Sequence, residues 1–241
     1  MRAAASELVS EAARSFHEKG YVPVDVLSAG EAARYRDLVL RLRDRAGVDP
    51  GSPAWDLPHG VSRTPELWSL IDHPRLLGSV REVLRTCDVI YAEHSALEVR
   101  RDCTASEWHR DPVAGRSSWG ELSVDRRVVR VACCLESGED LTWGAIDGSH
   151  RGERKSRTWE RTLRRLTQAD STWIPVRPGT CVLFDPRLAH AVGPTWETSV
   201  TALLAFGANN THTDRRRRRF ACPDNPYKLA LYGYLSERGL A

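Results

Sequence analysis

Three residues of the chain have the types and the spacing of a metal site. His109 and Asp111 are separated by one residue in the segment 107–112 (EWHRDP), and His190 ends the later segment 184–190 (FDPRLAH). On an extended strand, residues i and i+2 project to the same face, so an imidazole and a carboxylate can converge on one ion. Two histidines and one carboxylate form the facial triad of non-haem Fe(II) oxygenases, which leaves positions open for cosubstrate, water and O₂.

A His-x-Asp pair is a weak signal on its own. The chain has 8 histidines, so such a pair can also be a surface turn that carries a salt bridge. The remaining histidines have no ligand-like partner at short spacing, and we expect structural roles for them. The metal hypothesis therefore depends on the elements around the three residues.

The hydrophobic pattern predicts helices first and strands later. Helical spacing of apolar residues predicts a helix over 5–19 that Gly20 ends, and Ser28 fits the N-cap of a second helix that runs to about Arg45. A short strand is expected at 21–26. Two further short helices are expected over 65–71 and 74–85, followed by β-type runs at 88–100, 127–135, 172–176, 180–184 and 197–206. The charged segment 151–169 interrupts these runs. This order predicts a mainly β sandwich or barrel with an N-terminal helical layer.

Length and composition fit one enzyme-sized domain. The chain has 241 residues, of which 41% are hydrophobic and 28% charged. We expect a single domain over 1–241, with N-terminal helices and a first strand over 1–87, a β core over 88–210 and a C-terminal segment over 211–241. The chain has 6 cysteines and no CxxC pair, and we expect adjacent Cys133 and Cys134 to be buried on opposite faces of a strand.

Charge and hydropathy argue against nucleic acid and membrane partners. The formal net charge is only +3, and no stretch approaches the length of a membrane-spanning apolar helix. The N-terminal residues carry acids and lack an apolar segment, so we expect no secretory signal and a cytoplasmic protein.

Four blocks in order resemble the phytanoyl-CoA dioxygenase (PhyH)-like family of Fe(II)/2-oxoglutarate-dependent oxygenases. They are 16–24 (FHEKGYVPV), 108–111 (WHRD), 129–135 (VRVACCL) with 146–150 (IDGSH), and 178–185 (PGTCVLFD) with His190. The resemblance covers most of the chain. It implies a double-stranded β-helix (a cupin-like jelly roll) and a catalytic iron held by His109, Asp111 and His190.

The same resemblance implies a dioxygenase that uses Fe(II), 2-oxoglutarate and O₂. The implied reaction is hydroxylation of a small molecule such as a natural-product intermediate, with desaturation and ring closure left open. Related halogenases have a small residue where this chain has Asp111, so halogenation is disfavoured.

The chain departs from the family at the partner of the distal carboxylate of 2-oxoglutarate. That partner is usually a basic residue some ten positions after the second histidine, but residues 191–209 contain no Arg or Lys, and the position falls at Ser199, Val200 or Thr201. Arg130, in an otherwise apolar run, is our candidate for a displaced carboxylate partner. It could equally be a rim residue paired with an acid.

The missing basic residue leaves several alternatives open. The five arginines at 215–219 could fold back onto the site or bind an anionic substrate, although an exposed charged loop is the simpler interpretation. The protein could also be an iron oxygenase that does not use 2-oxoglutarate, a non-catalytic jelly-roll binding protein, or a cupin-like isomerase or hydrolase with another metal. Arg116, Trp119 and Trp143 are candidate substrate contacts, and Thr201 is a second candidate for cosubstrate binding.

Overall fold

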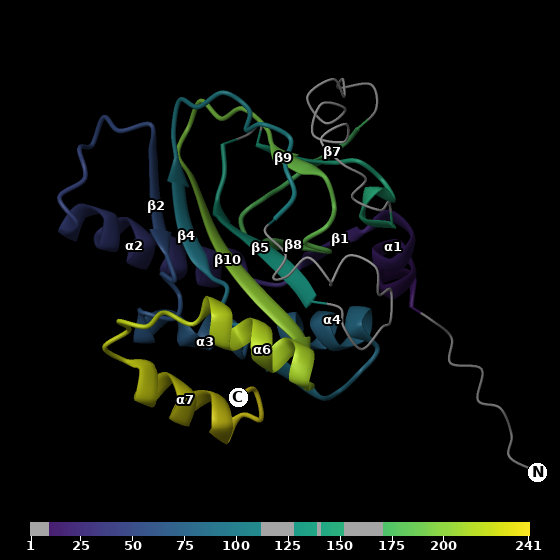
Figure 1. Cartoon of the computed structure of the whole chain (residues 1–241). Helices are drawn as coiled ribbons and strands as arrows, with labels where there is room; N and C mark the ends of the chain where they lie inside the picture. Colours follow the sequence, from purple (N-terminus) through teal and green to yellow (C-terminus); the bar gives the residue numbers. More distant parts are fainter. Residues whose placement is uncertain (1–9, 112–127, 139–140, 152–170) are drawn as a thin grey trace, which may run out of the picture.

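The computed structural model describes residues 10–111, 128–138, 141–151 and 171–241, and two antiparallel sheets form its centre (Figure 1). In the larger sheet the strands follow the order β1-β8-β5-β10-β4-β2, and β3 also pairs with β10. The smaller sheet has the order β7-β6-β9. The strands are β1 (Tyr21–Asp25), β2 (Ala54–Pro58), β3 (Val89–Tyr91), β4 (Ala96–Arg100), β5 (Val128–Glu136), β6 (Thr142–Ala145), β7 (Thr172–Pro175), β8 (Thr180–Phe184), β9 (His190–Val192) and β10 (Ser199–Ala208).

The N-terminal helices begin and end where their capping residues are. The hydroxyl of Ser10 accepts a hydrogen bond from the Ala13 amide at the start of α1 (Glu11–Lys19), and Gly20 ends this helix with a positive φ of 97°. Ser28 and Glu31 form a complete capping box at the start of α2 (Ala29–Arg45). The helix α3 (Trp68–Ile71) follows a short 3-10 turn, and α4 (Pro74–Leu84) comes next.

These helices pack on the outer face of the larger sheet. Side chains alternate along each strand, so every second residue of a strand points toward the helices. Val131, Leu183 and Leu204 are examples from β5, β8 and β10, and they share one apolar cluster with Phe16 of α1 and Leu76 of α4. The alternate residues point to the inner face, where the two sheets enclose a cavity.

The segment 103–109 adds an irregular edge to the smaller sheet. It runs antiparallel to 190–195, with isolated bridges from Cys103 to Thr195 and from His109 to His190. Between these bridges, the Ser106 amide donates to the Val192 carbonyl at 2.8 Å. With this edge, the sheets form the double-stranded β-helix that the sequence resemblance implies, and that prediction is confirmed.

Several elements differ from the sequence expectations. The run at 88–100 is two strands, because residues 92–95 leave the sheet and Glu93 has a positive φ of 53°. The three short strands β2, β6 and β9 were not predicted. Cys133 and Cys134 are buried on opposite faces of β5, as expected. The predicted charged segment at 151–169 lies almost entirely outside the described residues.

Two helices follow the last strand, where the sequence suggested an exposed loop. They are α6 (Thr211–Phe220), which contains the arginine run, and α7 (Lys228–Glu237). Arg217 pairs with Asp214 at 2.8 Å, and its guanidinium lies over the ring of Tyr232 in α7. The loop interpretation was therefore wrong for this run. Among the described helices, none combines the length and apolar character needed to cross a membrane.

Candidate metal centre and its cavity

Backbone pairing brings the two candidate histidines together. His190 is the first residue of β9, and His109 lies opposite it on the edge segment. The His109 amide donates to the His190 carbonyl at 3.0 Å, and the His190 amide donates back to the His109 carbonyl at 2.9 Å. The two imidazole rings consequently lie with their centroids 4.3 Å apart. Asp111 lies two residues further along the same segment.

The donor atoms of the three residues suit a divalent iron. One ligand atom from each of His109, Asp111 and His190 lies within 4.8 Å of the others, a grouping compatible with a single metal ion. Nδ1 of His109 lies 2.9 Å from the Glu107 carbonyl, and Nδ1 of His190 lies 3.0 Å from the Leu188 carbonyl. A ring that donates from Nδ1 to a carbonyl presents the lone pair of Nε2, which is how histidine binds a metal.

Burial and neighbouring charges keep His190 and Asp111 in the protonation states that a metal needs. Burial lowers the pKa of His190 to about 4, so its imidazole is neutral at physiological pH. Burial alone would raise the pKa of Asp111, but the charge and hydrogen bond of Arg130, together with the two neighbouring histidines, lower that pKa below its usual value. His190 and Asp111 can therefore bind a metal ion as a neutral imidazole and a carboxylate, and neither has to release a proton first.

Arg130 holds the carboxylate of Asp111 from the side of the larger sheet. Its Nε lies 2.7 Å from Oδ2 of Asp111, and its Nη1 donates to the backbone carbonyl of His94. Oδ1 of Asp111 faces Nε2 of His190 at 3.8 Å. The alternative interpretation of Arg130 was a residue at the rim of the barrel that pairs with an acid. Arg130 does pair with an acid, and this acid is the candidate metal ligand Asp111. Whether Arg130 also binds a cosubstrate stays a prediction.

The three residues open into a cavity of about 280 Å³ between the sheets. One wall is apolar and includes Leu141, Val176, Val182 and Phe184. Trp143 of β6 also lines it, and its indole stacks on the His190 ring at 5.4 Å with an interplanar angle of 18°. A mostly apolar cavity with a few polar groups is typical of small-molecule sites.

The part of the cavity lining on β2 and β4 of the larger sheet carries charges that were not predicted from the sequence. Glu98 and Arg100 of β4 point inward with Asp56 of β2, which pairs directly with Glu98. Burial and the charge of Asp56 raise the pKa of Glu98. The alternation in 96–100 (ALEVR) was the available signal, because it places two charged residues on one face of a strand whose other face is apolar.

The other predicted site residues have different outcomes. Trp143 and Thr201 both line the cavity, and Thr201 lies on β10 between Glu98 of β4 and Cys134 of β5. Arg116 and Trp119 lie outside the described residues. Trp108 points away from the cavity and packs edge-on against Trp173 with ring centroids 5.6 Å apart.

The sequence and the fold both have recognisable relatives. A family model described as phytanoyl-CoA dioxygenase (PhyH) matches residues 16–195. No curated protein matches the sequence. One similar solved structure is the non-haem alpha-ketoglutarate-dependent carbocyclase SnoK from nogalamycin biosynthesis, with 20% identity, a TM-score of 0.66, and coverage of 87% of this chain and 91% of SnoK.

Two further solved structures share the fold at similar identity. The epimerase SnoN from the same biosynthesis has 18% identity and a TM-score of 0.62, over 81% of this chain and 79% of SnoN. EvdO2 from Micromonospora carbonacea var. aurantiaca, complexed with 2-oxoglutarate, has 19% identity and a TM-score of 0.59, over 81% of this chain and 89% of EvdO2. At such identities, the likeness supports the same jelly-roll fold.

Proposed function

The chain belongs to the phytanoyl-CoA dioxygenase (PhyH) family, and we propose that it oxidises a small organic molecule at an iron held by His109, Asp111 and His190. Membership makes it an enzyme of the Fe(II)/2-oxoglutarate type, with Fe(II) and 2-oxoglutarate as cofactors and O₂ as cosubstrate. Bound ferrous iron supplies the capacity to activate O₂ for oxidation of an unactivated C–H bond.

One observation carries the proposal: three donor atoms of the right types converge in the lining of a cavity. The protein groups around them have separate tasks. Backbone carbonyls orient the two histidine rings, and Arg130 fixes one carboxylate oxygen of Asp111 so that the other faces His190. Partners of this kind hold ligands in position for a metal.

The cavity supports a substrate with apolar surface. Trp143 and Phe184 form an aromatic wall, with ring centroids 5.2 Å apart, beside the ring of His190. We place the substrate among natural-product intermediates, as the nogalamycin pathway of SnoK and SnoN suggests. Hydroxylation is the outcome we propose, and desaturation or cyclisation would need a substrate held differently relative to the iron.

A second candidate is an iron oxygenase of this fold that does not consume 2-oxoglutarate. The absence of Arg and Lys from residues 191–209 favours it, because the usual carboxylate partner is missing. A non-catalytic binding protein is less favoured, since such a protein has no need of ordered histidine rings and an ion-paired carboxylate.

Metal analysis tests the site directly. Protein loaded with Fe(II) without O₂ should hold one iron per chain, and Asp111→Ala and His190→Ala should each lose it. His73→Gln is the matched control, because His73 bonds Glu31 at the N-terminal helices and does not line the cavity. Iron retained at full stoichiometry by both ligand variants would overturn the assignment. Incorporation of ¹⁸O from ¹⁸O₂ into a product then distinguishes hydroxylation from desaturation.

A further inference from the structure

The strand next to β10 contributes an arginine to the cavity. In the described chain, the cationic side chains that line the cavity are Arg100 and Arg130. They enter it at opposite ends of β10, because Arg100 pairs with Ser199 at its start and Arg130 pairs with Ala205 near its end. Arg130 is the one at the metal ligands, where it contacts Asp111.

We propose that Arg100 binds the distal carboxylate of 2-oxoglutarate, in place of the basic residue that β10 lacks. This inference rests on the proposed function. Ser199 is one of the positions where that basic residue is expected, and it is the direct cross-strand partner of Arg100. Side chains of directly opposed residues in an antiparallel pair leave the same face a few ångströms apart. A guanidinium on β4 therefore serves the same part of the cavity as one on β10.

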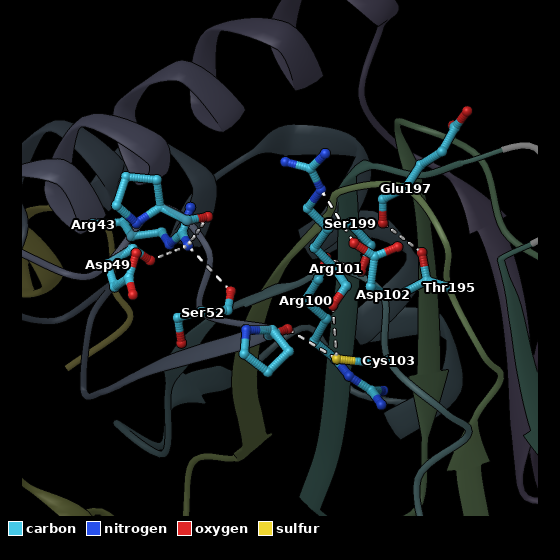
Figure 2. A network of polar contacts seen from close by, with 12 residues as sticks. Arg43, Asp49, Ser52, Arg100, Arg101, Asp102, Cys103, Thr195, Glu197 and Ser199 are labelled. Atoms are coloured by element: carbon cyan, nitrogen blue, oxygen red, sulfur yellow. Dashed lines mark hydrogen bonds and ion pairs between the residues drawn. The ribbon is translucent and has the colours of Figure 1, made fainter.

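The local contacts of Arg100 fix its position and leave some of its N–H donors available for a carboxylate. Its strand is paired on both sides, with Ala54 of β2 and Ser199 of β10. The Ser199 hydroxyl donates to the Arg100 carbonyl at 3.5 Å, and Nη2 of Arg100 donates to the Thr104 carbonyl at 2.9 Å (Figure 2 shows Arg100 beside Ser199). A guanidinium has five N–H donors, so this bond leaves donors for a carboxylate.

Arg130 is less suited to this task. Its Nε donates to Asp111 and its Nη1 to the His94 carbonyl, so two of its three guanidinium nitrogens already have protein acceptors, and one of these acceptors is a candidate metal ligand. A dicarboxylic cosubstrate bound to the iron at one end needs a positive group at the other end. Arg100 is the described residue that meets this need.

The two acids beside Arg100 make its positive charge more important for binding an anionic cosubstrate. Glu98 and Asp56 line the same end of the cavity and would repel a carboxylate. Arg100 is the described cation at this end that offsets them. Removal of its charge should therefore weaken binding of a dicarboxylate and spare an oxo acid without a distal carboxylate.

The test is an anaerobic titration of the Fe(II) protein with two oxo acids, followed by the visible charge-transfer band of an iron-chelated oxo acid. The two are 2-oxoglutarate and 2-oxopentanoate, in which a methyl group replaces the distal carboxylate. We expect Arg100→Ala to weaken 2-oxoglutarate about ten- to a hundredfold, the range of a lost hydrogen-bonded charge pair. Binding of 2-oxopentanoate should stay within about twofold, because most substitutions without a lost contact have small effects.

Two further variants sharpen the result. Arg100→Lys keeps the charge without the fork of donors, so its affinity for 2-oxoglutarate should lie between those of the wild type and Arg100→Ala. Arg101→Ala is the matched control, since Arg101 is an exposed neighbour that pairs with Asp102, and it should bind both acids as the wild type does.

Each contrary outcome has a distinct meaning. If Arg100→Ala binds both acids normally, or loses both to the same extent, the inference is wrong, and the second case assigns Arg100 a structural role. If the wild-type protein binds iron but develops no band with either acid, the proposed use of 2-oxoglutarate fails instead.

Discussion

Arg130 donates a hydrogen bond from Nε to Oδ2 of Asp111 at 2.7 Å, and both side chains are largely buried. The pair joins the inner face of the larger sheet to the candidate metal centre. The other oxygen of the carboxylate points to His190, so the arginine determines which oxygen is offered to a metal. Removal of one partner of a buried ion pair is destabilising, because the charge of the other partner stays buried without compensation.

Replacement of Arg130 should weaken iron binding without removing a ligand. We expect Arg130→Gln to lower the affinity for Fe(II) about ten- to a hundredfold, the usual effect of losing a group that orients a metal ligand. Competition with a coloured chelator under anaerobic conditions measures it. Arg101→Ala should match the wild type. Unchanged iron affinity in Arg130→Gln would mean that Asp111 is positioned by the backbone alone.

Glu98 should make the folded protein less stable as the pH rises. Burial and the charge of Asp56 raise its pKa in the folded state above the value of an unfolded chain. The folded state therefore holds the proton more tightly, and stability is lost as the pH rises from the unfolded pKa through the folded one. The glutamine of Glu98→Gln does not ionise, so this variant does not lose stability in the same way. The melting temperature of Glu98→Gln minus that of the wild type should therefore be larger at pH 8 than at pH 5.

The size of this effect can be read from melting curves of the iron-loaded protein kept free of O₂. Each kcal/mol removed corresponds to about 2–4 °C for a chain of this length. An advantage that is equal at both pH values would show that Glu98 does not change its ionisation between them.

Gly179 should be required for the joint between β1 and β8. It has a φ of +96°, its carbonyl accepts the amides of Val26 and Leu27, and an added Cβ would lie 2.3 Å from the Leu27 carbonyl oxygen. We expect Gly179→Ala to cost at least about 2 kcal/mol, from backbone strain and this clash with the main chain. Urea unfolding measures the loss.

The matched control is Gly233→Ala in the middle of α7. Nothing lies within 4 Å of its added Cβ, so the change should stabilise the helix by about 0.5–1 kcal/mol. If the two alanine variants had the same free energy of unfolding, the claim that Gly179 is required by its backbone conformation would be refuted.

The sequence predicted those parts of the fold and the site that local signals determine. Ser28 with Glu31 marks a helix start, and Gly20 marks a helix end, because capping depends on residues three or four positions apart. His109 and Asp111 lie two residues apart on an extended segment. The approach of His190 could be inferred only from the resemblance to a family, since nothing local links distant segments.

The charged end of the cavity could not be predicted in the same way. It depends on the register between β2, β4 and β10, which places Asp56 opposite Glu98, and Arg100 opposite Ser199. The strand β2 has only five residues and ends in proline, so its sequence gives no strong signal. The turn at Glu93 splits the predicted run at 88–100 and fixes which residues of β4 face inward.

The most direct test of the account is turnover of 2-oxoglutarate to succinate and CO₂ in the presence of Fe(II) and O₂. The wild-type protein should release succinate slowly without a substrate, and Asp111→Ala and His190→Ala should release none, while His73→Gln behaves as the wild type. Succinate release that persists in both ligand variants, or its absence from iron-loaded wild-type protein with every substrate tried, would contradict the assignment of these residues to an iron and 2-oxoglutarate-dependent site.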